Sequence, residues 1–479
     1  MKRSARVILL VCLGCWPALW PLRAGEPGRV MVATEAGTRS IAPHAAAHRA
    51  GTFVPGELIV QFREGTDDGV VERTLRDAGG ARARRAFRGQ RYLVNVDPSL
   101  SLSRAMETLR ARAEVDYVER NAVIRKAQAS TFTPNDPRFP IQWNFKMIGA
   151  ERMWAIQKGS PSVAVAVVDT GIAFEDYNDP VTGQVFRKAP DWSCRGAAGC
   201  NDTVFLQGHD FINNDDHAND DDQDSHGTHV ASTIAESTNN AFSFTGLAFG
   251  CALMPVKVLD ETGSGTVFSV ANGIDYAANF SQNGTNPVKV INMSLGSPDS
   301  STTIQRSVDA AFAKGIVIVA AAGNESKGSI DYPAALPNVI AVGALDARKQ
   351  TAFYSNFGPQ LSVVAPGGDC DRNDSGNAFG ADCVWQQGMN PDEVALGHYD
   401  QFLSLGLAGT SQATPHVSAL AALLISQGIT DPSAVRAAIE QTAERLGGAS
   451  PGGRNDTYGN GLIRPDAALA GLGFNQGPN

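Results

Sequence analysis

The 479-residue sequence has only one long apolar run, which lies at its start. Lys2, Arg3 and Arg6 precede this run, and Ala24 follows it at a plausible cleavage point. No later run approaches the roughly 20 apolar residues that span a bilayer, which excludes further spanning segments. Residues 1–24 are therefore predicted to be a secretory signal peptide. The mature protein is expected to be secreted, extracellular or periplasmic, with no membrane attachment.

Cysteine is also scarce. Of seven cysteines, Cys12 and Cys15 lie within the predicted signal peptide. The sequence then offers two pairs that each close a short polar loop, and local disulfides are expected in an exported protein. The predicted pairs are Cys194 with Cys200 and Cys370 with Cys383. Cys251 lies beside an apolar strand, where a buried, unpaired thiol is expected.

The chain as a whole lacks an excess of basic residues, since its net charge is −9. Residues 1–133 nevertheless carry a net charge of +8, and the remainder carries −17. The arginines at 82–91 lie within a patterned domain rather than in a loose basic tail, so no nucleic-acid partner is expected. The acidic remainder of the same chain is the simpler partner for this basic region.

Two differently patterned regions follow residues 25–54, whose scattered Gly, Pro and Ala predict a linker. In the first region, apolar residues alternate or recur at helical spacing in the order strand, helix, strand, strand, helix, strand. These segments are 57–63, 68–79, 82–88, 91–96, 101–113 and 115–119. The order predicts a ferredoxin-like α+β domain, a plan that many unrelated functions share.

From about residue 134, nearly continuous apolar runs alternate with helical patterns, as expected for parallel strands covered on both faces. The predicted strands are 162–169, 252–259, 288–296, 315–324 and 338–344. The predicted helices are 226–236, 266–280, 301–314, 411–427 and 432–444. One large α/β domain with a mostly parallel sheet flanked by helices is therefore expected.

Four polar residues stand where such a sheet gathers its ligands, near the carboxyl ends of its strands. Asp169 and Asn324 end strands, whereas His226 and Ser411 begin helices. Each alone is more often a turn or cap residue, but together they suit nucleophilic catalysis. A serine needs a His to take its proton and a carboxylate to orient that His. The Asn324 amide and the backbone N–H of Ser411 are candidate donors to a developing oxyanion.

The motifs VVDTGI, HGTHVAS, AAAGN and GTSQATPHV around these residues resemble, in order, the signatures of the subtilisin-like serine proteases. The resemblance implies a subtilisin-like peptidase domain at 131–479 that hydrolyses peptide bonds through an acyl-enzyme. Ser411 would be the nucleophile, His226 the general base and then acid, Asp169 its orienting carboxylate, and Asn324 an oxyanion-hole donor.

The same resemblance implies that residues 55–130 are an inhibitory propeptide, removed by self-processing between about residues 124 and 134. The expected partners are protein or peptide substrates and the chain's own propeptide, and a monomer is expected. Ser294, Leu295 and Gly296 match the strand that pairs with the substrate backbone.

The first specificity pocket, which receives the side chain of the residue whose carbonyl is attacked, also has matching positions. Its walls and base correspond to Ala322, Gly323, Glu325 and Asp331. The two carboxylates predict a preference for Lys or Arg there.

The stretch GHDFINNDDHANDDDQDSHG is the most acidic in the chain and resembles a thermitase-type calcium loop. The resemblance implies Asp210, Asn213 and Asp215 as ligands, and Asp136 matches an N-terminal calcium ligand of that branch. A structural Ca²⁺ is therefore expected, with a solvated loop as the alternative. His226 and His229 have HxxH spacing, but no third zinc ligand of suitable spacing follows.

The sequence leaves two alternatives to a serine protease, namely an aspartic protease and an inactive binding protein. Asp169-Thr170-Gly171 and Asp374-Ser375-Gly376 spell the paired signatures of an aspartic protease, although the second copy lies in a polar loop without a preceding apolar strand. A catalytically inactive binding protein with the same fold is the other alternative, and the filled catalytic positions argue against it.

Overall fold

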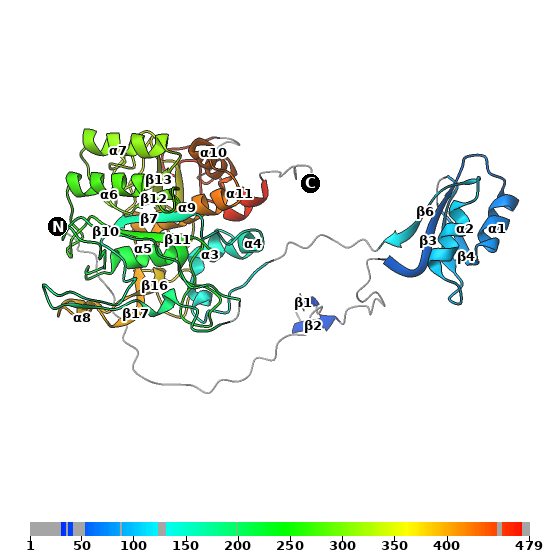
Figure 1. Ribbon diagram of the computed structural model, residues 1–479, viewed down its shortest axis with the longest axis horizontal. Helices are drawn as coiled ribbons and strands as arrows, with labels where there is room; N and C mark the ends of the chain where they lie inside the picture. The colour runs from blue at the N-terminus through cyan, green and yellow to red at the C-terminus, as the bar shows by residue number, and fades with distance from the viewer. Residues whose placement is uncertain are drawn as a thin grey trace, which may run out of the picture. The chain divides into compact units, whose positions relative to one another are not determined.

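The computed structural model describes residues 30–34, 37–41, 53–86, 89–122, 131–197, 199–447 and 453–471. The chain divides into two compact units, with the boundary between Gln128 and Ala129 (Figure 1). The predicted signal peptide and most of the predicted maturation region at 124–134 lie outside the described residues. Within the described residues, no helix is both long and apolar enough to cross a bilayer.

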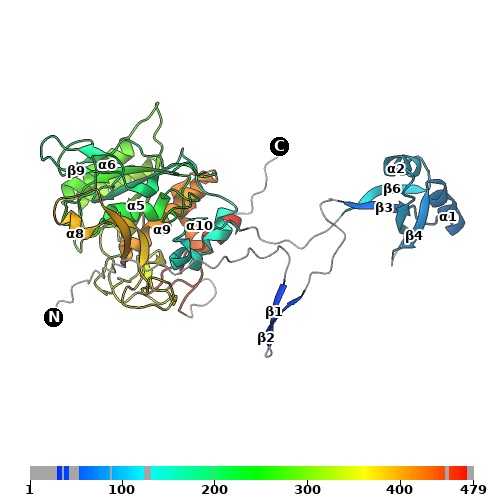
Figure 2. The same ribbon diagram turned by 90° about the horizontal axis from the view of Figure 1, so that it is seen from below.

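The N-terminal unit has the predicted order of elements around a four-stranded antiparallel sheet, β4-β5-β3-β6 (Figure 2). Its elements are β3 (Phe53–Phe62), α1 (Asp68–Asp77), β4 (Gly80–Arg85), β5 (Arg91–Val96), α2 (Leu102–Arg110) and β6 (Val115–Ala122). Leu58, Val60 and Phe62 alternate along β3 and are fully buried, together with Val71 and Leu75 of α1. The period-2 pattern thus supplies the core face of the sheet.

A short antiparallel pair lies within the segment predicted to be a linker. It consists of β1 (Val30–Thr34) and β2 (Gly37–Ile41). The scattered Gly, Pro and Ala of this segment did not indicate strands.

The C-terminal unit is built on a seven-stranded parallel sheet in the order β10-β11-β7-β12-β13-β14-β15. Its strands are β7 (Ala164–Asp169), β10 (His209–Asp210), β11 (Ala252–Lys257), β12 (Val288–Met293), β13 (Val317–Ala321), β14 (Val339–Leu345) and β15 (Val363–Pro366). The fold class predicted from the continuous apolar runs is confirmed.

Helices cover both faces of this sheet. The helices α6 and α7 pack on one face, whereas α5 and α9 pack on the other and contact each other (Figure 1). The helices of the unit are α3 (Trp143–Met147), α4 (Ala150–Trp154), α5 (His226–Ala235), α6 (Val267–Asn279), α7 (Thr302–Ala313), α8 (Pro391–Val394), α9 (Thr410–Ser426), α10 (Pro432–Thr442) and α11 (Pro465–Gly471). Two 3₁₀ turns occur at Phe139–Ile141 and Pro190–Trp192.

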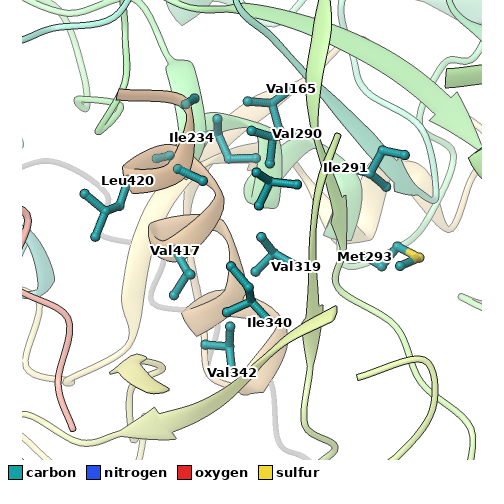
Figure 3. Close-up of a cluster of buried hydrophobic side chains, with 14 of the residues drawn as sticks. Val165, Ile234, Val290, Ile291, Met293, Val319, Ile340, Val342, Val417 and Leu420 are labelled. Atoms are coloured by element: carbon teal, nitrogen blue, oxygen red, sulfur yellow. The ribbon is translucent and has the colours of Figure 1, made fainter. Parts of the chain in front are cut away.

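The core lies between α9 and the central strands. Figure 3 shows Val417 of α9 directed toward Val319 and Ile340, whereas Ile291 and Met293 lie on the opposite side of the strands. All five side chains are almost fully buried. Burial of an aliphatic side chain contributes about 1.5–3 kcal/mol, so this contact holds the middle of α9 firmly against the central strands.

The two regions at 173–205 and 368–400, which the sequence did not assign, pack against each other. The first holds a hairpin of β8 (Tyr177–Asn178) and β9 (Val185–Phe186), and the second supplies one strand of the hairpin β16 (Val384–Met389) and β17 (Phe402–Leu407). The rings of Phe186 and Tyr399 stack with centroids 4.6 Å apart.

Both predicted disulfides are present, one in each of these regions. They join Cys194 to Cys200 and Cys370 to Cys383. Cys251 is buried and free, as expected, and burial raises the pKa of its thiol to about 11. This thiol therefore behaves as a small apolar side chain rather than as a nucleophile.

Candidate active site

Asp169 is the last residue of β7 and His226 is the first residue of α5, and the fold places their side chains next to each other. The His226 ring nitrogen Nδ1 lies 2.7 Å from Asp169 Oδ1. The Asp169 carboxylate is fully buried, and the same oxygen accepts from the Thr170 N–H at 2.8 Å. A carboxylate at Nδ1 fixes the ring so that Nε2 is free to accept a proton.

Thr170, which sequence reasoning did not single out, joins the two motifs. Its hydroxyl oxygen accepts from the Gly227 N–H at 2.9 Å and donates to Asp220 Oδ1 at 2.9 Å. A Cβ added to Gly227 would lie 2.1 Å from the Gly171 carbonyl oxygen, so only glycine permits this approach. The glycine after His226 thus lets the start of α5 touch the turn that follows Asp169.

The charges around His226 favour its protonated form. Burial alone would lower the pKa of the ring, but the Asp169 carboxylate, followed by those of Asp222 and Asp220, raises it to about 9. Asp222 Oδ2 also accepts from the His226 backbone N–H at 3.0 Å. His226 is therefore a stronger base than free histidine, and it is neutral only in alkaline solution.

Lys257 is a second residue that the sequence did not reveal. It is paired with Asp169 in the register of β11 and β7, and its side chain is 1% exposed. Its Nζ donates to the Thr170 carbonyl at 2.7 Å, to Asp221 Oδ1 at 2.7 Å and to the Leu259 carbonyl at 2.8 Å. This buried cation ties the turn after Asp169 to the neighbouring strand.

Ser411 is the second residue of α9 and lies beside the segment that follows β12. Its hydroxyl donates to the Ser294 carbonyl at 2.9 Å, and the Ser294 hydroxyl donates to the Ser411 carbonyl at 2.8 Å. Among the hydrogen bonds of the described residues, the Ser411 hydroxyl is thus directed to Ser294 rather than to His226. The hydroxyl proton must therefore leave the Ser294 carbonyl before it can pass to the ring.

The side-chain amide nitrogen of Asn324 and the backbone nitrogen of Ser411 border the same space next to Gly409. Asn324 Oδ1 accepts from the Thr410 N–H at 2.8 Å and from the Thr410 hydroxyl at 2.9 Å, which leaves Nδ2 directed away from that helix start. A Cβ added to Gly409 would lie 3.6 Å from both Asn324 Nδ2 and the Ser411 nitrogen. That Cβ would also lie 2.8 Å from Gln412 Oε1, so only a residue without a side chain leaves the space beside the two donors open.

The residues predicted to form the first specificity pocket also lie together. Asp331 and Tyr332 connect the segment that holds Ala322 to the segment predicted to pair with substrate, because the Asp331 N–H donates to the Ala322 carbonyl at 3.0 Å and Tyr332 pairs with Ser297. Lys327, which the sequence analysis missed, lies 3.3 Å from Glu325 Oε2 and 3.5 Å from Asp331 Oδ1.

The predicted calcium ligand Asp136 lies in a cluster of buried carboxyl groups with Asp191 and Glu236. Burial raises the pKa of Asp191 to about 7 and that of Glu236 well above its usual range. Backbone N–H groups bond both oxygens of Asp136, but the two Glu236 oxygens have no hydrogen-bond partner among the described residues. A proton or a hard cation is therefore required among these carboxyl groups.

The predicted ligands at 210–215 fit calcium less well. Asp210 Oδ1 accepts from the N–H groups of Ile212 and Asn213, and Oδ2 accepts from the Asn213 amide at 3.1 Å. Asp215 Oδ1 accepts from the His217 N–H at 2.8 Å. Donors, rather than further oxygens, surround these carboxylates. Neither here nor at the Asp136 cluster do the described ranges contain three His, Cys, Asp or Glu side chains placed to hold a metal ion together, so calcium at either place would need backbone or amide oxygens as further ligands.

The geometry disfavours zinc and an aspartic dyad. His229 is fully buried, its Nε2 lies 3.0 Å from the Val384 carbonyl, and burial lowers the pKa of the ring to about 3. The Asp374 carboxylate is bonded to Arg372 in a surface loop, whereas Asp169 is bonded to His226. The two aspartates thus have separate partners and do not share a proton.

Comparison with known proteins agrees with this geometry. Residues 160–461 match the subtilase family, and residues 40–121 match the fervidolysin N-terminal prodomain. The prodomain match begins at residue 40, before residue 55, where the propeptide was expected to begin. A thermophilic serine proteinase of Bacillus sp. is 34% identical over 403 residues, covering 84% of this chain and 85% of that protein. Thermitase of Thermoactinomyces vulgaris is 35% identical over 318 residues, covering 66% of this chain and 94% of that protein.

A solved protease structure from Pseudoalteromonas arctica is also similar, with a TM-score of 0.56 and 30% sequence identity. The match covers 71% of this chain and 99% of that one. With the family match and the relatives above, it leaves no other assignment for the C-terminal unit. The chain belongs to the subtilase family of serine peptidases.

Proposed function

We propose that the chain is a secreted serine endopeptidase with Asp169, His226 and Ser411 as its catalytic triad. The observation that carries this proposal is the 2.7 Å hydrogen bond between Asp169 and His226. In the same unit, α9 places Ser411 beside the two candidate oxyanion donors, Asn324 Nδ2 and the Ser411 N–H. Acyl transfer needs a nucleophile, a base, a carboxylate that orients the base and donors for the oxyanion, and these groups fill all four roles.

In the proposed reaction, a peptide first pairs with the segment Ser294–Gly296 as an added strand. The Ser411 hydroxyl turns from the Ser294 carbonyl to His226 Nε2, gives up its proton and attacks the substrate carbonyl. Asn324 Nδ2 and the Ser411 N–H bind the resulting oxyanion. His226 then protonates the leaving amine, and a water activated by the same ring hydrolyses the acyl-enzyme. Asp169 stabilises the imidazolium throughout.

Covalent labelling tests the role of Ser411. A fluorophosphonate is expected to add one label to the wild-type protein, on the peptide that contains Ser411, and none to Ser411→Ala. The inactive binding protein is the competing function, and the bond from Ser411 to Ser294 favours it. It would be supported if the folded wild type neither took up the label nor cleaved casein.

We further propose that the chain is made as a zymogen. A family prodomain precedes the peptidase unit, and its arginine-rich sheet is opposite in charge to the acidic peptidase unit. Domain boundaries at 24, 54 and 130 follow from this reading. Secretion is supported by the N-terminal run and by a 34% identical relative named an extracellular protease, from Xanthomonas campestris pv. campestris. Detection of the mature protein in the culture medium of the producing cell tests the localisation.

Calcium would be structural in this protein and takes no part in the chemistry. Of the predicted ligands, Asp136 has the better support, since a cation there would satisfy the Glu236 oxygens and relieve the repulsion from Asp191. The melting temperature of the mature protein is expected to fall when EGTA replaces millimolar calcium, and Asp136→Asn is expected to remove that difference. An equal melting temperature in both buffers would mean that a shared proton, and not calcium, satisfies the cluster.

A further inference from the structure

Asp331 lies between the segment Ala322–Glu325 and the segment Ser294–Ser297, which would be the two walls of the proposed first specificity pocket. A Cβ added to Gly323, on one segment, would lie 2.6 Å from Asp331 Oδ2, and a Cβ added to Gly296, on the other, would lie 3.3 Å from Asp331 Cβ. The Asp331 side chain is only 6% exposed. Its carboxylate therefore lies at the inner end of the space between the walls.

Lys327 reaches this carboxylate from the solvent side. Its side chain is 38% exposed, and its Nζ is shared between Glu325 and Asp331. The turn that carries it is held by Asn356, whose Oδ1 accepts from the backbone N–H groups of both Glu325 and Lys327. Ser326, between them, has a left-handed φ of 57°. The lysine thus stands on a fixed turn, next to the two acids.

We propose that Lys327 is a specificity-determining residue, whose ammonium group competes with a substrate Lys or Arg for the two carboxylates and so weakens selection of basic residues. This inference rests on the proposed function, because it requires a substrate side chain to enter the pocket. Glu325, Lys327 and Asp331 together carry a net charge of −1, which leaves a modest preference for a cation. Without the lysine, the charge at the pocket becomes −2.

The size of the effect follows from repulsion between two cations. A substrate cation that contacts the carboxylates also lies near Lys327 Nζ. For unit charges about 6 Å apart, Coulomb's law gives a change of about threefold at the dielectric constant of water and about 100-fold at that of a protein surface. Because Lys327 is partly exposed, we expect a change of about tenfold.

The test uses four peptide anilides that differ only at the residue whose carbonyl is attacked, which is Arg, Lys, Leu or Gln. The mature forms of the wild type, Lys327→Met and Lys327→Gln are compared by kcat/KM. Lys349→Met is the matched control, since Lys349 is 36% exposed and pairs with the distant Glu444. Fluorophosphonate titration gives the concentration of active enzyme. Assays run at pH 9, because burial and then the Glu325 carboxylate raise the pKa of Asp331.

The ratio of kcat/KM for Arg to that for Leu is expected to rise about tenfold in both Lys327 variants and to stay unchanged in Lys349→Met. The gain is expected to shrink in 1 M NaCl, because salt screens the charges, and to vanish in Lys327→Met/Asp331→Asn, because the remaining Glu325 gives the same net charge of −1 as in the wild type. An unchanged ratio in titratable Lys327 variants would overturn the role of Lys327 while leaving the proposed function standing. Failure of the wild type to titrate and to cleave any of the four peptides would overturn both.

Discussion

A graded pair of substitutions tests the oxyanion site. Asn324→Leu removes the Nδ2 donor itself, whereas Thr410→Val keeps Asn324 and removes one of the two bonds that hold its amide. Loss of an oxyanion donor costs about 2.7–4 kcal/mol of transition-state stabilisation, or about 10²–10³-fold in kcat. The Thr410 hydroxyl also accepts from the Gly323 N–H at 3.2 Å, but only its bond to Oδ1 orients the Asn324 amide. Loss of one neutral hydrogen bond costs about 1 kcal/mol, and the Thr410 N–H still holds Oδ1 at 2.8 Å. We therefore expect a decrease in kcat of only about fivefold for Thr410→Val.

The assay is the steady-state hydrolysis of one peptide anilide by mature wild type, Asn324→Leu and Thr410→Val, each titrated for active sites. Both decreases are expected in kcat, with KM changed less than twofold, because the oxyanion forms only after binding. Equal losses in the two variants would refute the reasoning that Thr410 acts through the orientation of Asn324. A loss confined to KM would refute the assignment of Asn324 itself.

Three further predictions concern the same site. Since the carboxylates around His226 raise its pKa to about 9 and the base must be neutral, kcat/KM is expected to rise with pH through about 9, and a plateau already reached at pH 7 would contradict this. Gly409→Ala places a Cβ 3.6 Å from both oxyanion donors, so kcat is expected to fall at least about 100-fold, and near-normal turnover would exclude this space as the oxyanion site. Lys257→Met leaves buried partners unpaired, and urea unfolding is expected to show a loss of about 3–5 kcal/mol, whereas a loss below about 1 kcal/mol would mean that water replaces the ammonium group.

The sign of the His226 effect on stability is opposite to its effect on activity. The ring has a higher pKa in the folded chain than in the unfolded one, so its contribution to stability is complete below about pH 6.5. That contribution is lost as the pH rises through about 9. The base thus becomes active over the same range in which its protonated form stops stabilising the fold.

Strands and helices were predictable where one physical rule governs a whole segment. The continuous apolar runs became the buried parallel strands, and the small and aliphatic residues at 411–427 became α9, which spans Thr410–Ser426. The predicted strand 315–324 ends earlier, at Ala321. The Ala322 N–H still donates to the Val342 carbonyl of β14, but the Ala322 carbonyl accepts from Asp331 and Gly323 has a φ of 105°, so the chain turns away from the sheet. Periodicity does not mark such a departure, since the departing residues are as apolar as the strand.

The site was predictable only in the residues that stand in motifs. Asp169 ends a strand, His226 begins a helix, Ser411 is the second residue of a helix and Asn324 follows the end of β13 by three residues. The parallel sheet brings such positions to one edge. Lys257 contacts Thr170, which lies 87 positions away in the sequence. Lys327 contacts its partners across a turn in which Ser326 has a left-handed φ. Residue spacing indicates neither contact. The hairpin β16–β17 was missed because β16 lies inside the unassigned region 368–400 and β17 directly follows it.

The central claim is that Ser411 attacks peptide bonds, including one in its own chain. The most direct measurement is the intact mass and N-terminal sequence of the purified wild type beside Ser411→Ala, both expressed with calcium. The account predicts that only the wild type begins between about residues 124 and 134, whereas Ser411→Ala keeps its propeptide. The same N-terminus on both proteins would contradict self-processing by Ser411.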